Sequence, residues 1–289
     1  MPSGQIERAI ALVLLAHLLF ALVDTSTKWL LGAGLAVLQL AFLRYAVHFA
    51  ITLVESGLRK PAWPRMSVRL WALICLRSLC LMTATMANFL ALGQLPLVVT
   101  SAILFLSPVL VCLFARPLLG ERLTPARLVA VGLGFSGVLV ILNPFDATVN
   151  WYAVLMLYPA SAMALYMVLT RMLSGQTSPL VMQFSTGAIG TVGLLPFGLA
   201  AWVTPETGLA WGLALALGLF AWAGHEVLTR AHAFAEASLL APYGYSFVIY
   251  LALTGWLVFG DVPTPQTVLG AGLVIFAGLI VHRGTRRAP

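Results

Sequence analysis

The chain has 289 residues, of which 61% are hydrophobic and only 9% are charged, and its mean hydropathy is +0.99. Soluble domains carry about 25% charged residues, so this composition excludes a soluble enzyme or binding domain and indicates an integral membrane protein. The formal net charge of +7 follows the membrane topology described below and does not indicate a nucleic-acid surface.

Ten apolar segments follow one another along the chain with short linkers. About 20 apolar residues are needed for a helix to cross a bilayer. In chain order, the predicted helices cover residues 9–31, 35–57, 68–92, 97–118, 124–142, 151–171, 179–203, 208–231, 238–259 and 266–282. The first is long and contains Asp24 and Lys28, so we expect a retained helix and not a cleaved signal. The predicted fold class is an all-α integral membrane protein with ten transmembrane helices.

Lys and Arg gather in alternate linkers. They stand between predicted helices 2 and 3, between 4 and 5, at the ends of 6 and 8, and in the C-terminal tail, as Arg59, Lys60, Arg65, Arg69, Arg116, Arg122, Arg171, Arg230, Arg283, Arg286 and Arg287. The intervening linkers, near residues 32, 93, 146, 206 and 261, contain neither. Because basic residues are retained on the cytoplasmic side, the sequence predicts that both termini are cytoplasmic.

One hairpin sequence occurs twice. Gly120-Glu-Arg-Leu-Thr-Pro125 recurs 140 positions later as Gly260-Asp-Val-Pro-Thr-Pro265, and the second copy lacks Lys and Arg. The copies should therefore lie on opposite sides of the membrane. Five helices per unit is an odd number, so the second unit would be inverted, as in many secondary transporters. We predict two five-helix repeats, at residues 1–143 and 144–289.

Ionisable residues inside predicted helices are the first candidates for function, because a charge at the helix centre costs about 2.5–3.5 kcal/mol on insertion scales. His17, Asp24 and Lys28 are spaced by 7 and 4 and share one face of the first helix. Arg44 and His48 are one turn apart on the second. Structural alternatives to cargo binding are an Asp24–Lys28 pair that neutralises itself and an Asp24–Arg44 bridge between helices.

Further polar candidates lie on the third and eighth predicted helices. Arg77 suits either an inner gate or ligand binding, whereas a hydrogen bond between helices is the simplest role for Asn88. On the eighth, Trp222, His225 and Glu226 lie near one stripe. Glu226 is a candidate to take a proton, hold an ammonium group or neutralise a basic residue. The candidates for a gate or proton relay are His17, His48, Arg77 and His225.

Tyrosines form a second group of candidates for cargo binding. Tyr158 and Tyr166 lie on the sixth predicted helix, and Tyr243 and Tyr245 on the ninth. A tyrosine at membrane depth offers apolar area and a hydroxyl, which suits a small amphiphilic ligand. Ordinary core packing is the alternative.

Enzymatic patterns are missing from the sequence. Cys75, Cys80 and Cys112 lack metal-ligand spacing, and neither a Gly-x-Ser-x-Gly elbow nor a phosphate-binding Gly-Lys-Ser/Thr loop occurs. We therefore expect a protein that is not an enzyme, with no catalytic residue, metal site or cofactor.

Several motifs together resemble the drug/metabolite transporter superfamily, in members with two EamA-type domains. They are Phe42-Leu43-Arg44-Tyr45, Asn88-Phe89-Leu90-Ala91-Leu92, Ser107-Pro108, Leu119-Gly120-Glu121-Arg122-Leu123 and Gly255-Trp256-Leu257-Val258-Phe259-Gly260-Asp261-Val262-Pro263. The resemblance covers both halves, and the second hairpin has Asp261 where first-half copies usually carry Glu.

The resemblance implies a bacterial inner-membrane protein with a central cavity between its halves, which transports small metabolites by alternating access, often outward. Similar members export aromatic and other neutral amino acids. In such a site, cations would meet the cargo carboxylate, Asp24 or Glu226 its ammonium, and tyrosines its side chain. The implied partners are a small-molecule cargo, the lipid bilayer and, as an open alternative, protons. Competing functions are an uptake carrier or multidrug exporter of the same fold, a passive channel, and a membrane-embedded enzyme.

Overall fold

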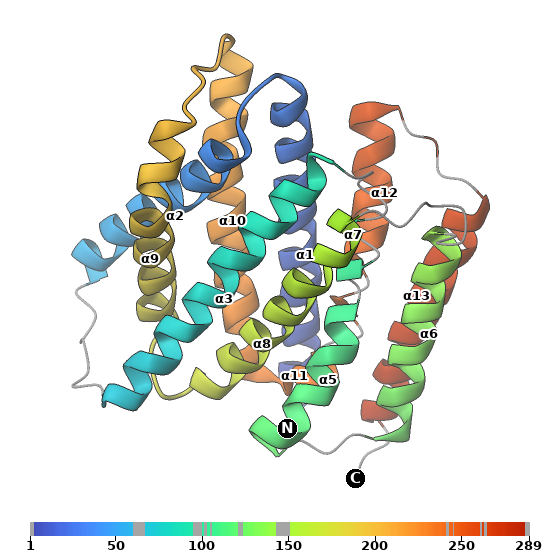
Figure 1. The fold of residues 1–289 in the computed structure, drawn as a ribbon. Helices are drawn as coiled ribbons and strands as arrows, with labels where there is room; N and C mark the ends of the chain where they lie inside the picture. The colour runs from blue at the N-terminus through green and yellow to red at the C-terminus, as the bar shows by residue number, and fades with distance from the viewer. Residues whose placement is uncertain are drawn as a thin grey trace.

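The computed structural model describes residues 3–59, 67–94, 100, 103–104, 106–120, 124–142, 151–240, 243–244, 246–260, 262 and 265–286. Its helices are α1 (Ser3–Gly32), α2 (Val37–Arg59), α3 (Val68–Leu92), α5 (Leu106–Leu119), α6 (Pro125–Leu142), α7 (Trp151–Leu155), α8 (Leu157–Leu173), α9 (Pro179–Ala200), α10 (Gly208–Phe234), α11 (Ala237–Leu240), α12 (Ser246–Phe259) and α13 (Pro265–Arg286). They run up and down through one bundle, with both termini at the same end (Figure 1).

Two predicted helices are broken in the structure. The segment 151–171 divides into α7 and α8 at Met156, because Pro159 has no N–H to donate to the carbonyl of Leu155. The segment 238–259 divides into α11 and α12, and the intervening sequence contains Pro242 and Gly244. Within the predicted segment 97–118, α5 covers Leu106–Leu119, and the described residues 100, 103 and 104 are helical as well. The predicted repeat boundary at 143/144 lies outside the described residues.

Hydroxyl side chains start three of the long helices. The hydroxyl oxygens of Ser67, Ser178 and Thr207 accept hydrogen bonds from the backbone N–H three residues later, at 3.2, 3.3 and 3.1 Å. This capping satisfies a donor that the first helical turn leaves unpaired. It fixes where α3, α9 and α10 begin.

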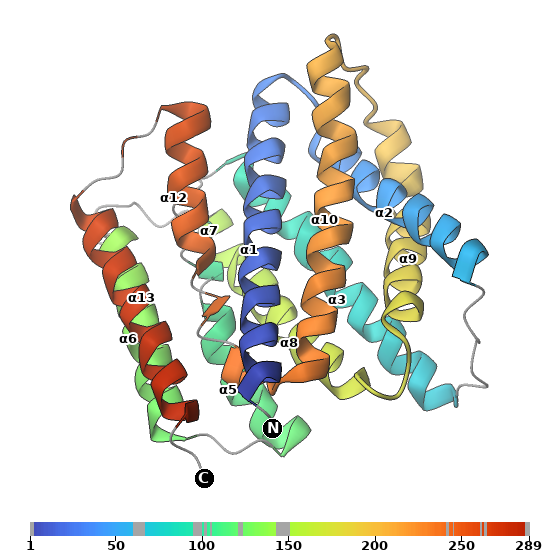
Figure 2. The same cartoon turned by 180° about the vertical axis from the view of Figure 1, so that it is seen from behind.

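The residues at the two ends of the repeated hairpin sequence have the same local structure in both copies. Gly120 and Gly260 follow α5 and α12 with φ angles of 68° and 73°, which only glycine adopts without strain. Their N–H groups donate to the carbonyls of Arg116 and Trp256, at 3.1 and 3.0 Å. Prolines 125 and 265 then begin α6 and α13. The two hairpins lie at opposite ends of the bundle (Figures 1 and 2). We call the end that carries both termini and Arg116 the basic end.

The main helix contacts join the two halves of the sequence. α1 packs on α10, α2 on α9, α3 on α8, and α6 on α13, and Figure 2 shows the peripheral α6–α13 pair beside the rest. Close approach depends on glycine at two crossings: Gly224 lies against the Phe20 ring and Gly190 against the Tyr45 ring. Either contact leaves no room for a side chain.

The outer surface is apolar, as expected beside lipid. Large hydrophobic side chains such as Leu58 and Val192 are 80% and 70% exposed. Among the described residues, five helices are long and apolar enough to cross a bilayer, at Gly4–Gly32, Val37–Leu58, Val68–Leu92, Pro179–Ala200 and Gly208–Phe234. The sequence prediction of a mostly helical membrane protein is therefore confirmed in its coarse form.

Candidate functional site

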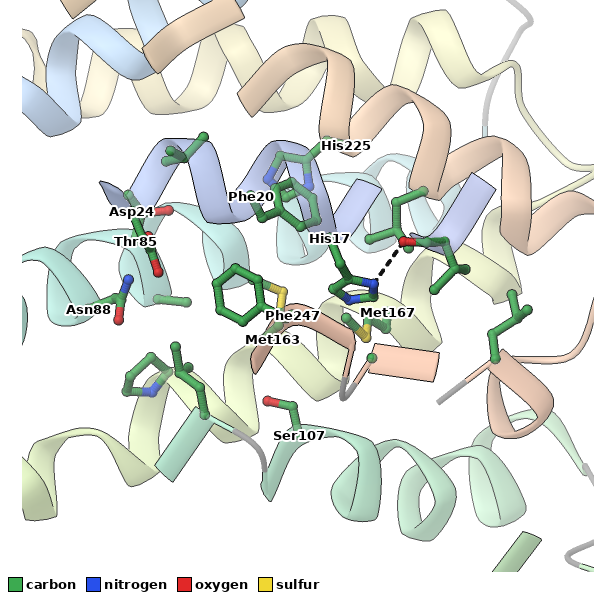
Figure 3. A pocket seen from close by; sticks show the side chains of 18 of the residues that line it. His17, Phe20, Asp24, Thr85, Asn88, Ser107, Met163, Met167, His225 and Phe247 are labelled. Atoms are coloured by element: carbon green, nitrogen blue, oxygen red, sulfur yellow. Dashed lines mark hydrogen bonds between the residues drawn. The ribbon is translucent and has the colours of Figure 1, made fainter. Parts of the chain in front are cut away.

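A cavity of about 130 Å³ lies inside the bundle. It is lined by Val13, His17, Phe20, Val23, Asp24, Arg44, Ala84, Thr85, Asn88, Phe89, Leu104, Ser107, Pro159, Met163, Met167, His225, Leu228, His232, Ala237, Leu240, Gly244 and Phe247. Residues from α1, α2, α3 and α5 face residues from α8, α10, α11 and α12. Figure 3 shows the side chains converging from these elements. Both halves of the chain therefore build one site.

The cavity is long and differs in polarity along its length. On α1 its lining extends from Val13 to Asp24, which is about 16 Å at 1.5 Å per residue. Asp24, Thr85 and Asn88 lie together at one end, and Phe247, Met163 and His17 follow along the cavity (Figure 3). A ligand that fills it would meet polar groups first and then an apolar belt.

Arg44 is held at the polar end by two hydrogen bonds. Its guanidinium donates to Thr85 Oγ1 at 2.6 Å and to His225 Nε2 at 2.9 Å. Because arginine only donates, His225 Nε2 must accept, so the imidazole is neutral with its proton on Nδ1. The Nε–H of Arg44 has no partner among the described residues. This buried cation is oriented by neutral groups and retains a donor for a ligand.

Asp24 faces the same end of the cavity. It is 8% exposed, and burial of this kind disfavours a carboxylate that has no ion-pair or ligand partner. The expected Asp24–Lys28 pair is not formed between these two described residues, because the Lys28 ammonium lies 4.5 Å from the centre of the Phe259 ring. The direct Asp24–Arg44 bridge is absent as well, since Arg44 bonds to Thr85 and His225. An acid and a base thus line one end without neutralising each other by contact.

Histidines lie along the rest of the cavity. His17 Nδ1 is 2.8 Å from the carbonyl of Val13, a contact drawn in Figure 3, and its ring meets Phe20 edge-on. His232 is 2% exposed, and neither ring nitrogen has a partner within the described part of the chain. A buried polar atom without a partner costs about 1–3 kcal/mol. His232 is therefore a second group that a ligand would stabilise.

A buried hydrogen-bond network extends from Arg44 to Arg77. Tyr166 OH lies 3.1 Å from His225 Nδ1 and accepts from Arg77 at 2.8 Å. All five donors of Arg77 are used, by Tyr166, Thr170, Met182 O, Thr186 and Thr229. Arg77 therefore joins α3, α8, α9 and α10, and has no donor left for cargo.

Several predicted site residues lie outside the cavity. Tyr158 is 48% exposed and donates to Thr83 Oγ1 at 2.6 Å, so it faces the outer surface. Glu226 accepts from Arg230 Nε at 2.7 Å, one turn away on α10. Predicted residues that the structure describes but that do not line the cavity are Lys28, His48, Arg77, Tyr158, Tyr166, Trp222, Glu226 and Tyr243. Tyr245 lies outside the described residues.

The predicted residues that do line the cavity are His17, Asp24, Arg44, Asn88 and His225. Sequence reasoning missed Thr85, Ser107 and His232. Two of these carried a detectable signal: Thr85 is three residues before Asn88, and His232 is seven after His225, so each shares a helix face with a predicted residue. Ser107 entered the sequence analysis only through the Ser107-Pro108 motif, and in the structure its hydroxyl donates to the carbonyl of Ala160 on α8 at 2.8 Å.

Comparison with known families decides the class of protein. The model of the EamA-like transporter family matches residues 7–143 and, separately, residues 150–283. The chain belongs to this family. It is an EamA-type member of the drug/metabolite transporter superfamily, as its motifs predicted, and a bacterial membrane transporter.

Curated relatives of this EamA-type transporter carry different cargoes. It is 28% identical to the pseudopaline exporter CntI of Pseudomonas aeruginosa, over 98% of this chain and 99% of that one. It is 29% identical to a riboflavin transporter of Rhizobium johnstonii, over 99% and 94%, and 24% identical to an S-adenosylmethionine uptake transporter of Rickettsia prowazekii, over 89% and 86%. A solved crystal structure with 19% identity covers 99% of both chains with a TM-score of 0.77, which shows the shared fold.

Proposed function

We propose that this EamA-type transporter exports amino acids, neutral or aromatic, or related small metabolites through the central cavity by alternating access. The observation that carries the proposal is the polar end of the cavity, where Asp24 and Arg44 line the same space without forming a direct ion pair. A zwitterion offers an ammonium for Asp24 and a carboxylate for Arg44. Asn88 Oδ1, which has no protein partner in the described part, would accept from the same ammonium group.

Cavity size supports a small cargo. Pockets that enclose drug-sized ligands measure about 300–1,000 Å³, whereas this one measures about 130 Å³. An amino acid suits this volume better than riboflavin does. The apolar belt of Phe20, Met163, Met167 and Phe247 would receive its side chain.

The second part of the proposal is that the two halves form inverted five-helix repeats that move against each other. The helix pairs support it. In inverted repeats α1 corresponds to α8, α2 to α9, α3 to α10 and α6 to α13. Exchanging each helix with its counterpart converts the α1–α10 contact into the α3–α8 contact, and it leaves the α2–α9 and α6–α13 contacts unchanged. Two separate family matches and the two equivalent hairpins support it as well. The basic end would then be cytoplasmic.

Single cysteines at Thr124 and Val262 test this topology. Both positions are exposed in the structure and lie beside the two hairpins. In a variant without the three native cysteines, a membrane-impermeant maleimide added to intact cells should label the cysteine at 262 and not the one at 124. Labelling of both from outside would refute the inverted arrangement.

Counterflow in proteoliposomes tests the cargo. Vesicles loaded with unlabelled phenylalanine should accumulate labelled phenylalanine, and the uptake should saturate. The absence of counterflow with every amino acid tried would reject the proposed cargo. An ohmic current without saturation would instead identify a passive channel.

Uptake is the second candidate, since the S-adenosylmethionine relative is named for uptake. Flux measured from each face of oriented vesicles separates the two directions. A proton gradient imposed on the same vesicles tests coupling: cargo accumulation against its own gradient would show a proton-driven exporter, and equilibration alone would show facilitated diffusion.

A further inference from the structure

A second recess opens at the basic end of the bundle. It has a volume of about 690 Å³ and is bordered by the α5–α6 hairpin, the end of α8 and the end of α10. Its polar lining comes from Thr124, Arg127, Arg171, Ser174 and Glu236. Two guanidinium groups therefore face one carboxylate in a wide, polar depression outside the central cavity.

An ion pair lies among the residues that line this recess. Arg127 on α6 contacts Glu236 at 2.6 Å, with exposed side-chain fractions of 13% and 37%. Arg171 on α8 donates to the backbone carbonyl of His232 at 2.7 Å. Both arginines thus hold the segment from His232 to Glu236, which joins α10 to α11.

Residues of the stretch 232–240 line both the recess and the central cavity. The N–H groups of Leu239 and Leu240 both donate to the carbonyl of Glu236, at 3.2 Å, and this turn forms α11. His232, Ala237 and Leu240 line the central cavity, whereas Glu236 lines the recess. One short turn of chain, held by a partly exposed ion pair, therefore borders both spaces, and we call it the partition.

We propose that the recess is an entry site for the carboxylate of the cargo, and that the Arg127–Glu236 pair is the latch which this carboxylate releases. The inference rests on the proposed function. A carboxylate bound between Arg127 and Arg171 replaces Glu236 as the partner of Arg127, and the ammonium of a zwitterion then meets Glu236. Exchange of one exposed carboxylate for another changes little in energy, so the partition opens when cargo arrives and closes when it leaves.

The test measures how fast a cysteine that replaces Leu240 is labelled, in a variant without the native cysteines. Leu240 is 3% exposed and lines the cavity behind the partition. A membrane-impermeant maleimide is added from the basic end, with or without phenylalanine. Phenylalaninamide, which keeps the ammonium and side chain but lacks the carboxylate, is the matched probe.

With the latch intact, labelling should be slow, and phenylalanine should accelerate it at least threefold while phenylalaninamide does not. Glu236→Gln should give fast labelling without cargo. Arg127→Gln should do the same and should abolish any further acceleration by phenylalanine. Arg116→Gln, which removes an exposed cation at the same end outside the recess, is the control and should behave as the parent does.

Parental labelling rates in Glu236→Gln and Arg127→Gln would overturn the latch. Equal effects of phenylalanine and its amide, or none, would overturn the entry site. Acceleration by anionic phosphatidylglycerol in the vesicles, in place of phenylalanine, would assign the arginines to a lipid headgroup. Failure of the proposed function gives a different pattern, in which phenylalanine counterflow is absent although Glu236→Gln still exposes position 240.

Discussion

Replacing Thr85 by valine should weaken cargo binding by removing the group that orients Arg44. Valine has nearly the shape of threonine, so the change removes little volume and one hydroxyl, which also donates to the carbonyl of Leu81 at 2.9 Å. Thr85 Oγ1 accepts from Arg44 at 2.6 Å and lies 3.0 Å from Tyr45 OH. A hydrogen bond to a charged group contributes about 1.5–3 kcal/mol, and 1.4 kcal/mol corresponds to a tenfold change in binding.

Arg44 keeps its second bond to His225, so we expect the smaller end of this range, a rise in KM of about tenfold. The assay is saturable phenylalanine counterflow, with thermal unfolding in detergent as the measure of stability. Thr83→Val is the matched control, because Thr83 makes the same type of contact on the outer side of α3, with Tyr158. A Thr85→Val protein with the KM of Thr83→Val would refute the role of Arg44 in cargo binding.

Two further comparisons, each between two substitutions, follow from the structure. Asp24→Asn should lower flux by at least tenfold, because Asp24 lines the cavity. Glu226→Gln should change flux less than twofold, because Glu226 lies outside the cavity lining and pairs with Arg230 on its own helix. Equal losses in counterflow would refute the distinction. Gly224→Ala places a methyl group 2.6 Å from the Phe20 ring and should cost about 1–3 kcal/mol of stability. Gly212→Ala on the same helix meets nothing within 4 Å and should leave the melting temperature unchanged or higher, so equal melting shifts would contradict the packing argument.

Sequence patterns predicted most helices well because each pattern reports a property of its own segment. Apolar length located α3 at the residues the structure shows, and the paired hairpins were readable because Gly120 and Gly260 need the same backbone conformation. The interruptions at Met156 and before α12 were missed, although proline lies near both.

Partners of the buried charges were harder to predict, because spacing along one helix does not say how far its neighbour is tilted. α2 crosses the bundle obliquely while α1 stands upright (Figure 1). Arg44 therefore reaches Thr85 and His225 and not the carboxylate of Asp24. By contrast, the Glu226–Arg230 pair follows from a spacing of four on one helix and was predictable from the sequence. The recess at the basic end is lined by three segments that are distant in the sequence, so no local sequence pattern predicts it.

Access to the central cavity is the most direct test of transport through it. Ala84 is 2% exposed and lines the cavity beside Thr85, so a single cysteine at this position should react with a small, charged methanethiosulfonate from either face of the membrane and lose counterflow in proportion. Phenylalanine bound against Thr85 and Arg44 should cover position 84 and slow this reaction, even though it opens the partition at position 240 on the basic side. Full transport after complete modification at position 84 would show that cargo crosses the protein elsewhere.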